Sequence, residues 1–322
     1  MKTRVIIQVA AGLACTLFFL WLALHRVPSG AVIATLRSAD PVWLAAAILC
    51  YAANLGLRTW RWQIILRPAA AVPYPAVAKT LVVGYGLNVI MPARLGELFR
   101  AEFFKKAYGL PRVWGLTSIV IERLFDGLAV VTILGIGLLL ATVTRRLSGV
   151  LVGVFITAGA IFGVVLLVAL CLAGPLTSRL FASLPRIATQ LAMMQRGFEL
   201  LRSRRIIEVV VLTLVIYVPD SLSVWFAVKA VGLTLGFADA LILEGAASLS
   251  TLVPSGPAFL GTLQFAYALA IGYAGGTRTI GVAAATLFQL CLMVPVALIA
   301  TGLLIHGSGS VIYSALAGKE VD

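Results

Sequence analysis

Three charged residues that could bind a ligand follow a proline: Arg94, Glu97 and Arg100, each three positions from the next. If a helix resumes after Pro92, this spacing places the three side chains on one face. Guanidinium groups bind phosphate oxygens through paired hydrogen bonds, and a neighbouring carboxylate can hold them in place. The spacing therefore predicts a site for a phosphate group, with Glu97 orienting the arginines or contacting a cationic group.

A second charged group, Glu122, Arg123 and Asp126, lies within an apolar run from about Val113 to Thr144. Glu122 and Asp126 share a helix face, and Arg123 can pair with Asp126 three positions further on. On insertion scales, each such charge costs about 2.5 to 3.5 kcal/mol at the centre of a bilayer, so these side chains are expected to face protein or water. Arg123 is a further candidate for phosphate, and the two carboxylates are candidates for holding the arginines.

Polar residues in other apolar segments extend the candidate site. Asp220 follows Pro219, which removes a backbone hydrogen bond and kinks a helix, so its carboxylate is expected beside freed carbonyl groups. A capping or structural role for this kink is the alternative. Neutral hydrogen bonds along the same path are expected from Asn88, Ser250, Ser255 and Gln264.

The sequence predicts neither a metal site nor a cofactor. Each of the four cysteines lies within an apolar run, without the spacing of a metal or redox motif. The two histidines, His25 and His306, lie at the ends of apolar runs, far from the acidic motifs. A Walker A lysine motif is also missing, so ATP hydrolysis by this chain is not expected.

The elements that position these residues are membrane helices. Of 322 residues, 61% are hydrophobic and 11% are charged, and the mean hydropathy is +1.06. A soluble domain has about 25% charged residues. Long continuous apolar runs favour helices over a β-barrel, whose strands alternate in segments of about 10 residues. Lysine and arginine in the cytoplasmic loops of a membrane protein account for the net charge of +13, so no nucleic-acid partner is expected.

The predicted architecture is an all-α polytopic membrane protein with about six full transmembrane helices and two re-entrant, broken hairpins in one domain, residues 1–322. Proline and glycine leave apolar halves shorter than the roughly 20 residues of a span. Broken backbone at membrane depth normally lines protein or a cavity. The hairpins are expected at about 79–108 and 240–273, with breaks at Pro92, Pro254, Gly256 and Pro257. The spans are expected at about 5–24, 42–62, 113–144, 147–173, 206–228 and 280–305.

This topology, with both termini cytoplasmic in the plasma membrane, places most lysines and arginines on the cytoplasmic side. They include a basic segment at about 174–205, an amphipathic helix on the inner leaflet or a solvated loop. Residues 57–62 form a cluster of basic and aromatic side chains, which predicts an interfacial belt. The two hairpins are expected to enter the membrane from opposite sides. In each of them, a proline follows a leucine by five residues: Pro92 after Leu87, and Pro254 after Leu249. This pattern predicts an inverted repeat, which in transporters places the site between the broken elements.

The charged motifs also resemble a known family. The stretches NVIMPARLGELFR from Asn88, ERLFD from Glu122 and PSGPAFLGTLQ from Pro254 resemble the lysylphosphatidylglycerol synthase transmembrane-region family, also described as flippase-like membrane proteins. The resemblance covers nearly the whole chain. In that family, the membrane region of the multiple peptide resistance factor moves aminoacylated phosphatidylglycerol between leaflets, and a separate soluble domain makes the lipid. This chain departs from the pattern at Gln264, where many relatives have glutamate.

The resemblance implies a lipid translocator rather than an enzyme, since the chain ends about 17 residues after its last predicted span and no synthase domain is expected. The predicted substrate is a phosphate-containing membrane lipid, either a phospholipid or a polyprenyl-phosphate-linked lipid. Movement is expected to be downhill, or coupled to a proton or ion through Glu97, Asp126 or Asp220. The alternatives are a small-solute secondary transporter, an integral-membrane enzyme acting on a lipid phosphate, and charges that only pair with each other.

Overall fold

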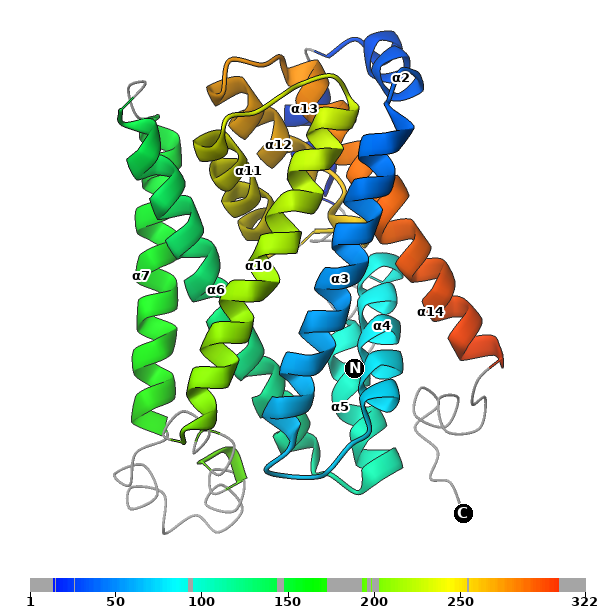
Figure 1. The fold of residues 1–322 in the computed structure, drawn as a ribbon, viewed down its shortest axis with the longest axis vertical. Coiled ribbons are helices and arrows are strands. Elements are labelled where there is room, and N and C mark those ends of the chain that lie inside the picture. Colours follow the sequence, from blue (N-terminus) through cyan, green and yellow to red (C-terminus); the bar gives the residue numbers. More distant parts are fainter. Residues whose placement is uncertain are drawn as a thin grey trace.

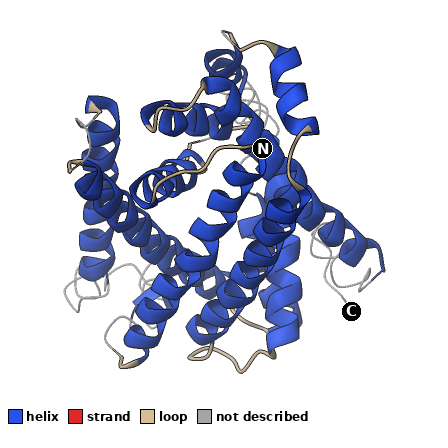
Figure 2. Ribbon diagram, turned by 45° about the horizontal axis from the view of Figure 1, so that its top comes forward, coloured by secondary structure: helices blue, strands red, loops and turns tan. Residues whose placement is uncertain are grey.

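The structure, a computed structural model, describes residues 14, 16–25, 27–91, 95–143, 148–172, 193–195, 198, 203–253 and 255–306. Its described residues form helices that run mainly along the long axis of the molecule (Figure 1). Loops and turns connect them, and the described part contains no strand (Figure 2). The predicted all-α class is therefore confirmed for this part. Pro92, Arg94, Pro254 and most of the basic segment 174–205 lie outside the described residues.

Within the part of the chain that the structure describes, five helical elements are long and apolar enough to cross a membrane. Each agrees with a predicted span within a few residues, and α10 continues through Pro219. The chain is therefore a polytopic membrane protein. The five elements are α3 (Pro41–Leu66), α6 (Arg112–Ala141), α7 (Gly149–Leu172), α10 (Arg205–Ala230), and the run of α13 (Arg278–Phe288), η4 (Gln289–Met293) and α14 (Val294–His306).

The N-terminal region contains a helix beyond the end of the predicted first span. A helix over Thr16–Leu24 is followed, after a short break, by α2 (Ser29–Arg37) at an angle of 85°. The remaining residues of the predicted first span, 5–13, lie outside the described part. α3 then begins with Asp40 as its N-cap, because the Asp40 carboxylate accepts a hydrogen bond from the Val42 N–H at 2.8 Å.

Two helical hairpins lie among the spans. α4 (Tyr74–Ile90) and α5 (Leu95–Tyr108) form one in the lower half of the molecule, and α11 (Phe237–Ser250) and α12 (Thr262–Tyr273) form the other in the upper half (Figure 1). Each of these helices has at most 17 residues, fewer than the roughly 20 that a span needs. α4 contacts the short helix η3 (Pro257–Phe259), so the first hairpin touches the break of the second.

The break of the second hairpin contains strained backbone. Ala258 and Phe259 have φ angles of 54° and 57°. Residues other than glycine rarely adopt this left-handed region, and it persists only where the surrounding structure enforces it. The Gly256 N–H donates to Thr16 Oγ1 at 2.5 Å, and the Gly261 N–H donates to Gln264 Oε1 at 2.8 Å. The predicted interruption at Gly256 and Pro257 is therefore confirmed.

The first hairpin depends on a close approach between glycines. A Cβ atom at Gly96 would collide with the carbonyl oxygen of Gly84, on the opposite helix. The Gly96 N–H also donates to Asn88 Oδ1 at 2.9 Å. Small residues allow membrane helices to pack at this distance. Gly96 thus fixes how α5 packs against α4.

We expect Gly96→Ala to separate α4 from α5 and to lower the thermal unfolding temperature of the detergent-purified protein by several degrees. Gly163→Ala on α7 is the matched control, since a Cβ atom there meets nothing within 4 Å. The unfolding temperature of this control should match that of the wild type. If Gly96→Ala also unfolds at the wild-type temperature, the hairpin is packed less tightly than the structure indicates.

Candidate functional site

One face of α3 carries Asn54, Arg58 and Arg61, at positions i, i+4 and i+7. The predicted interfacial belt over residues 57–62 is wrong for much of this segment, because Arg61 and Trp62 are completely buried. α3 packs along α10, and its basic face is turned toward the interior of the protein. These side chains of α3 therefore belong to an internal site rather than to an anchor at the membrane surface.

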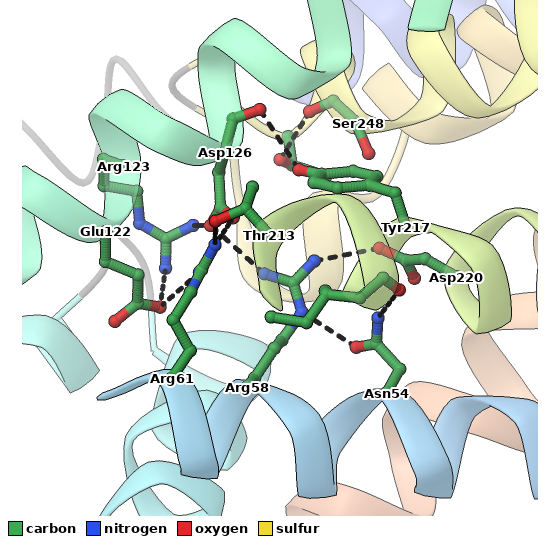
Figure 3. A network of polar contacts seen from close by, with 12 residues as sticks. Asn54, Arg58, Arg61, Glu122, Arg123, Asp126, Thr213, Tyr217, Asp220 and Ser248 are labelled. Carbon is green, nitrogen blue, oxygen red and sulfur yellow. Dashed lines mark hydrogen bonds and ion pairs between the residues drawn. The ribbon is translucent and has the colours of Figure 1, made fainter. Parts of the chain in front are cut away.

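Arg58 connects acidic residues on two other helices. Its Nη1 atom lies 3.1 Å from Asp126 Oδ2 on α6, and its Nη2 atom lies 2.9 Å from Asp220 Oδ2 on α10 (Figure 3). Its Nε atom donates to Asn54 Oδ1 at 2.8 Å, and Asn54 Nδ2 donates to the Ile216 carbonyl of α10 at 3.0 Å. A single side chain, 11% exposed, thus ties three helices together.

Arg123 brings the first hairpin into the same network. Its Nε atom lies 3.1 Å from Glu97 Oε1 on α5, and its Nη1 atom lies 3.7 Å from Asp126 Oδ2. The predicted pairing of Arg123 with Asp126 is therefore confirmed. With 29% of its side chain exposed, Arg123 is the most accessible arginine of the described network.

A second layer of charge is closed to solvent. Arg100 and Glu122 are 0% and 1% exposed, and Arg100 Nη2 lies 2.6 Å from Glu122 Oε2. The Arg100 guanidinium also lies over the Trp62 ring, 3.7 Å from its centre. Arg61, equally buried, lies 2.7 Å from Asp126 Oδ1. This layer joins α3, α5 and α6 and presents no free guanidinium face to a ligand.

The more accessible charges line a cavity. Its empty volume, counted together with the adjoining solvent at its open mouth, is about 1150 Å³. The polar lining comes from α3, α6, α10 and both hairpins: Asn54, Arg58, Tyr85, Asn88, Glu97, Arg123, Asp126, Tyr217, Asp220, Glu244 and Ser248. The apolar lining includes Leu249, Leu252, Phe259, Leu263, Phe288, Met293 and Val296, from the second hairpin and the C-terminal helices. The cavity therefore has charged and apolar walls.

The structure separates the predicted site residues into two sets. Asn88, Glu97, Arg123, Asp126 and Asp220 line the cavity, whereas Arg100 and Glu122 lie in the buried layer. In the ion pairs of the described network, the arginines 58, 61, 100 and 123 contact the carboxylates of residues 97, 122, 126 and 220. An entering anion must therefore compete with a carboxylate for its guanidinium group.

Of the polar residues predicted on the second hairpin, Ser250 and Gln264 bond within the protein, whereas Ser255 Oγ is buried without a hydrogen-bond partner in the described part of the chain. Ser250 Oγ donates to a backbone carbonyl of its own helix at 2.7 Å, and Gln264 Nε2 donates to Gln289 Oε1 at 2.6 Å. Gln289, the first residue of η4, donates in turn to the Ala258 carbonyl at 2.8 Å. These bonds fasten the break to the last span. Ser250, Ser255 and Gln264 are not among the residues that line the cavity.

Several cavity residues were not predicted from the sequence: Asn54, Arg58, Tyr85, Tyr217, Glu244 and Ser248. The i, i+4, i+7 spacing on α3 was a usable signal, but the adjacent tryptophans favoured an interfacial belt. Glu244 could also have been identified from the sequence, since an acidic residue within an apolar half of a hairpin is a candidate functional residue. Within the described residues, no group of three or more His, Cys, Asp or Glu side chains is arranged to hold a metal ion.

The fold and the site define a polytopic helical membrane protein with a charged internal cavity between two hairpins. The chain belongs to the lysylphosphatidylglycerol synthase transmembrane-region family, whose model matches residues 7–300. The resemblance seen in the motifs is therefore confirmed. The chain is also similar to glycosyltransferase AglD of Haloferax volcanii, with 29% identity over 145 residues. This match covers 45% of the chain and only 23% of the length of AglD.

Proposed function

We propose that this protein moves a phosphate-containing lipid, either a phospholipid or a polyprenyl-phosphate-linked lipid, between the two leaflets of the membrane. The observation that carries this proposal is a cavity with charged and apolar walls, among helices of spanning length. A lipid has the same two parts. Arg58 and Arg123 would hold the phosphate through paired, charge-assisted hydrogen bonds, while the acyl or isoprenoid chain stays against apolar surface.

The two hairpins support movement rather than static binding. They extend inward from opposite ends of the molecule, and α4 contacts η3 (Figure 1). We interpret them as re-entrant hairpins of an inverted repeat, with a sixth span at about 5–24 completing the fold. In transporters of this kind, rocking of one repeat against the other exposes a central site to each side in turn.

The described basic residues support an orientation in the plasma membrane. One end of the bundle carries Arg67, Lys79, Lys105, Lys106, Arg112, Arg204 and Arg205, and the other carries Arg37, Lys229 and Arg278. Lysine and arginine are enriched on the cytoplasmic side of membrane proteins. We therefore assign the first end, which includes the α3–α4 and α5–α6 connections, to the cytoplasm.

The similarity to AglD makes a sugar-carrying lipid a useful second test substrate. The name of AglD describes glycosyl transfer, but this chain matches only 23% of the length of AglD. We do not propose catalysis, because the cavity carboxylates paired with arginine serve to hold guanidinium groups. The substrate class that we propose is the lipid phosphate common to phospholipids and polyprenyl-phosphate lipids.

The test is lipid translocation in proteoliposomes, with fluorescent phosphatidylglycerol and a fluorescent polyprenyl phosphate as probes. We expect the wild-type protein to move at least one probe faster than protein-free liposomes. Arg123→Gln should slow this movement by about 10- to 100-fold, because a hydrogen bond to a charged group contributes roughly 1.5 to 3 kcal/mol. Arg112→Gln, which alters an arginine 59% exposed outside the cavity, should move lipid at the wild-type rate.

Two further measurements in the same vesicles separate the competing functions. Uptake of radiolabelled inorganic phosphate without lipid movement would indicate a small-solute transporter. Recovery of a chemically altered probe, detected by mass spectrometry, would indicate an enzyme that acts on lipid phosphate. Unaltered probes that cross no faster than in protein-free liposomes would contradict the proposal.

A further inference from the structure

Glu244 is the cavity carboxylate without a cationic partner among the described residues. It lies on α11 with 1% of its surface exposed, and its Oε1 atom accepts a hydrogen bond from Ser248 Oγ at 2.8 Å. Its Oε2 atom is buried and has no hydrogen-bond partner in the described part of the chain. The carboxylates of residues 97, 122, 126 and 220 differ, since each lies within 3.1 Å of a guanidinium nitrogen.

The elements around Glu244 do not compensate its charge. Between residues 127 and 141, α6 carries no titratable side chain, and the nearest titratable side chain on α12 is a tyrosine. Among the described residues, the cationic group that acts on Glu244 is Arg58, which already contacts Asp126 and Asp220. The titratable and charged groups that face Glu244 or share its cavity are Tyr217 and Asp220 of α10, Tyr267 of α12, Tyr51 and Arg58 of α3, Tyr85 of α4, Glu97 of α5, and Arg123 and Asp126 of α6.

Burial of this kind favours the neutral form of a carboxyl group. An ionised carboxylate without a counterion is costly in an apolar interior, and such groups bind a proton instead. A lipid phosphate would increase the cost, because it brings a second negative charge into the same cavity. Proton binding at Glu244 and phosphate binding at the arginines should therefore favour each other. Acidic side chains within membranes serve as proton sites in many transporters.

Building on the proposed function, we propose that the cavity binds a proton on Glu244 together with the lipid phosphate at Arg58 and Arg123. The proton comes from a hydronium ion on the side to which the cavity is open: one O–H bond of hydronium breaks, leaving water, and an O–H bond forms at Oε2 of Glu244. No bond of the lipid changes. The two move through the membrane together, and the proton leaves when the phosphate is released.

Glu244→Gln tests this coupling, because the amide keeps the shape of the protonated acid but neither binds nor releases a proton. We expect a pH gradient to speed wild-type movement of fluorescent phosphatidylglycerol toward the alkaline side by about tenfold, within the usual range of coupling between sites. Glu244→Gln should move the lipid at one rate with or without the gradient. Glu208→Gln, an exposed acid on α10, should respond like the wild type.

A binding measurement makes the outcome independent of transport. Calorimetric titration of dihexanoyl-phosphatidylglycerol into the purified protein, in two buffers of different ionisation enthalpy, counts the protons taken up per lipid. The titration is done in the pH range where the affinity of the wild type for this lipid falls as the pH rises. There we expect a clear proton uptake on lipid binding in the wild type and almost none in Glu244→Gln. A gradient response or proton uptake that persists in Glu244→Gln would overturn the inference, as would a wild-type protein that moves lipid without either effect. A wild type that binds no lipid and moves none would overturn the proposed function itself.

Discussion

Replacing Arg58 and Asp220 together, as Arg58→Gln with Asp220→Asn, is expected to abolish lipid translocation while the protein remains folded. Arg58 presents two nitrogen atoms, 3.1 Å and 2.9 Å from carboxylates that a phosphate can displace. Losing two charge-assisted hydrogen bonds of roughly 1.5 to 3 kcal/mol each lowers the rate by at least about 100-fold. The measurement is the rate of movement of fluorescent phosphatidylglycerol in proteoliposomes.

The double substitution is preferable to Arg58→Gln alone, which would leave Asp220 buried without its counterion. Removing one positive and one negative charge keeps the network balanced, so the unfolding temperature should stay close to that of the wild type. The matched control is Arg112→Gln with Glu102→Gln, the same chemical change in a pair whose arginine is 59% exposed. Wild-type translocation by a folded Arg58–Asp220 double variant would mean that Arg58 only holds the helices together.

Arg100→Ala is expected to have the largest effect on stability. Its guanidinium is completely buried, 2.6 Å from Glu122 and stacked on Trp62. Removing Arg100 leaves the buried Glu122 carboxylate with only longer contacts, 3.9 Å to Arg61 and 3.8 Å to Arg123. Removing one partner of a buried pair costs about 3 to 5 kcal/mol. Arg112→Ala removes an exposed partner and should cost about 0 to 1 kcal/mol. The free energy of unfolding in detergent measures both changes.

A second variant separates charge from packing in this buried layer. Arg100→Met with Glu122→Gln removes both charges and keeps an unbranched side chain over the Trp62 ring. It should recover much of the stability that Arg100→Ala loses, because no unpaired charge remains. If Arg100→Ala and Arg112→Ala lower the unfolding free energy equally, the Arg100–Glu122 pair is not the closed contact that the structure shows.

The spans and hairpins were accessible from the sequence because length and hydrophobicity determine them. Runs of about 20 apolar residues predict spans, and clustered proline and glycine predict breaks. The predicted first span ends at Leu24, as the helix over Thr16–Leu24 does, but α2 and its 85° angle to that helix were not predicted, because the residues at a break do not set the angle between the helices that it joins. Element type is therefore a local property, whereas the angle at which short helices meet is not.

The site was only partly accessible, because the same residue types serve surface and interior. Arg58 and Arg61 lie next to tryptophans, as in an interfacial belt, and only the packing of α3 along α10 turns them inward. Gln264 has the chemistry of a ligand contact, but the broken backbone beside it needs the same hydrogen bonds. Sequence spacing identifies which residues share a helix face, and tertiary packing decides what that face contacts.

The central claim is that lipid passes through the cavity, and blocking the cavity without altering its charge tests it most directly. Val89 lines the cavity on α4, and a tryptophan there would occupy space that the lipid needs. Val164→Trp makes the same change on α7, at a side chain that is 59% exposed. The measurement is the translocation rate of fluorescent phosphatidylglycerol by the wild type and both variants. We predict loss of movement in folded Val89→Trp alone; equal rates in all three proteins would contradict passage through the cavity.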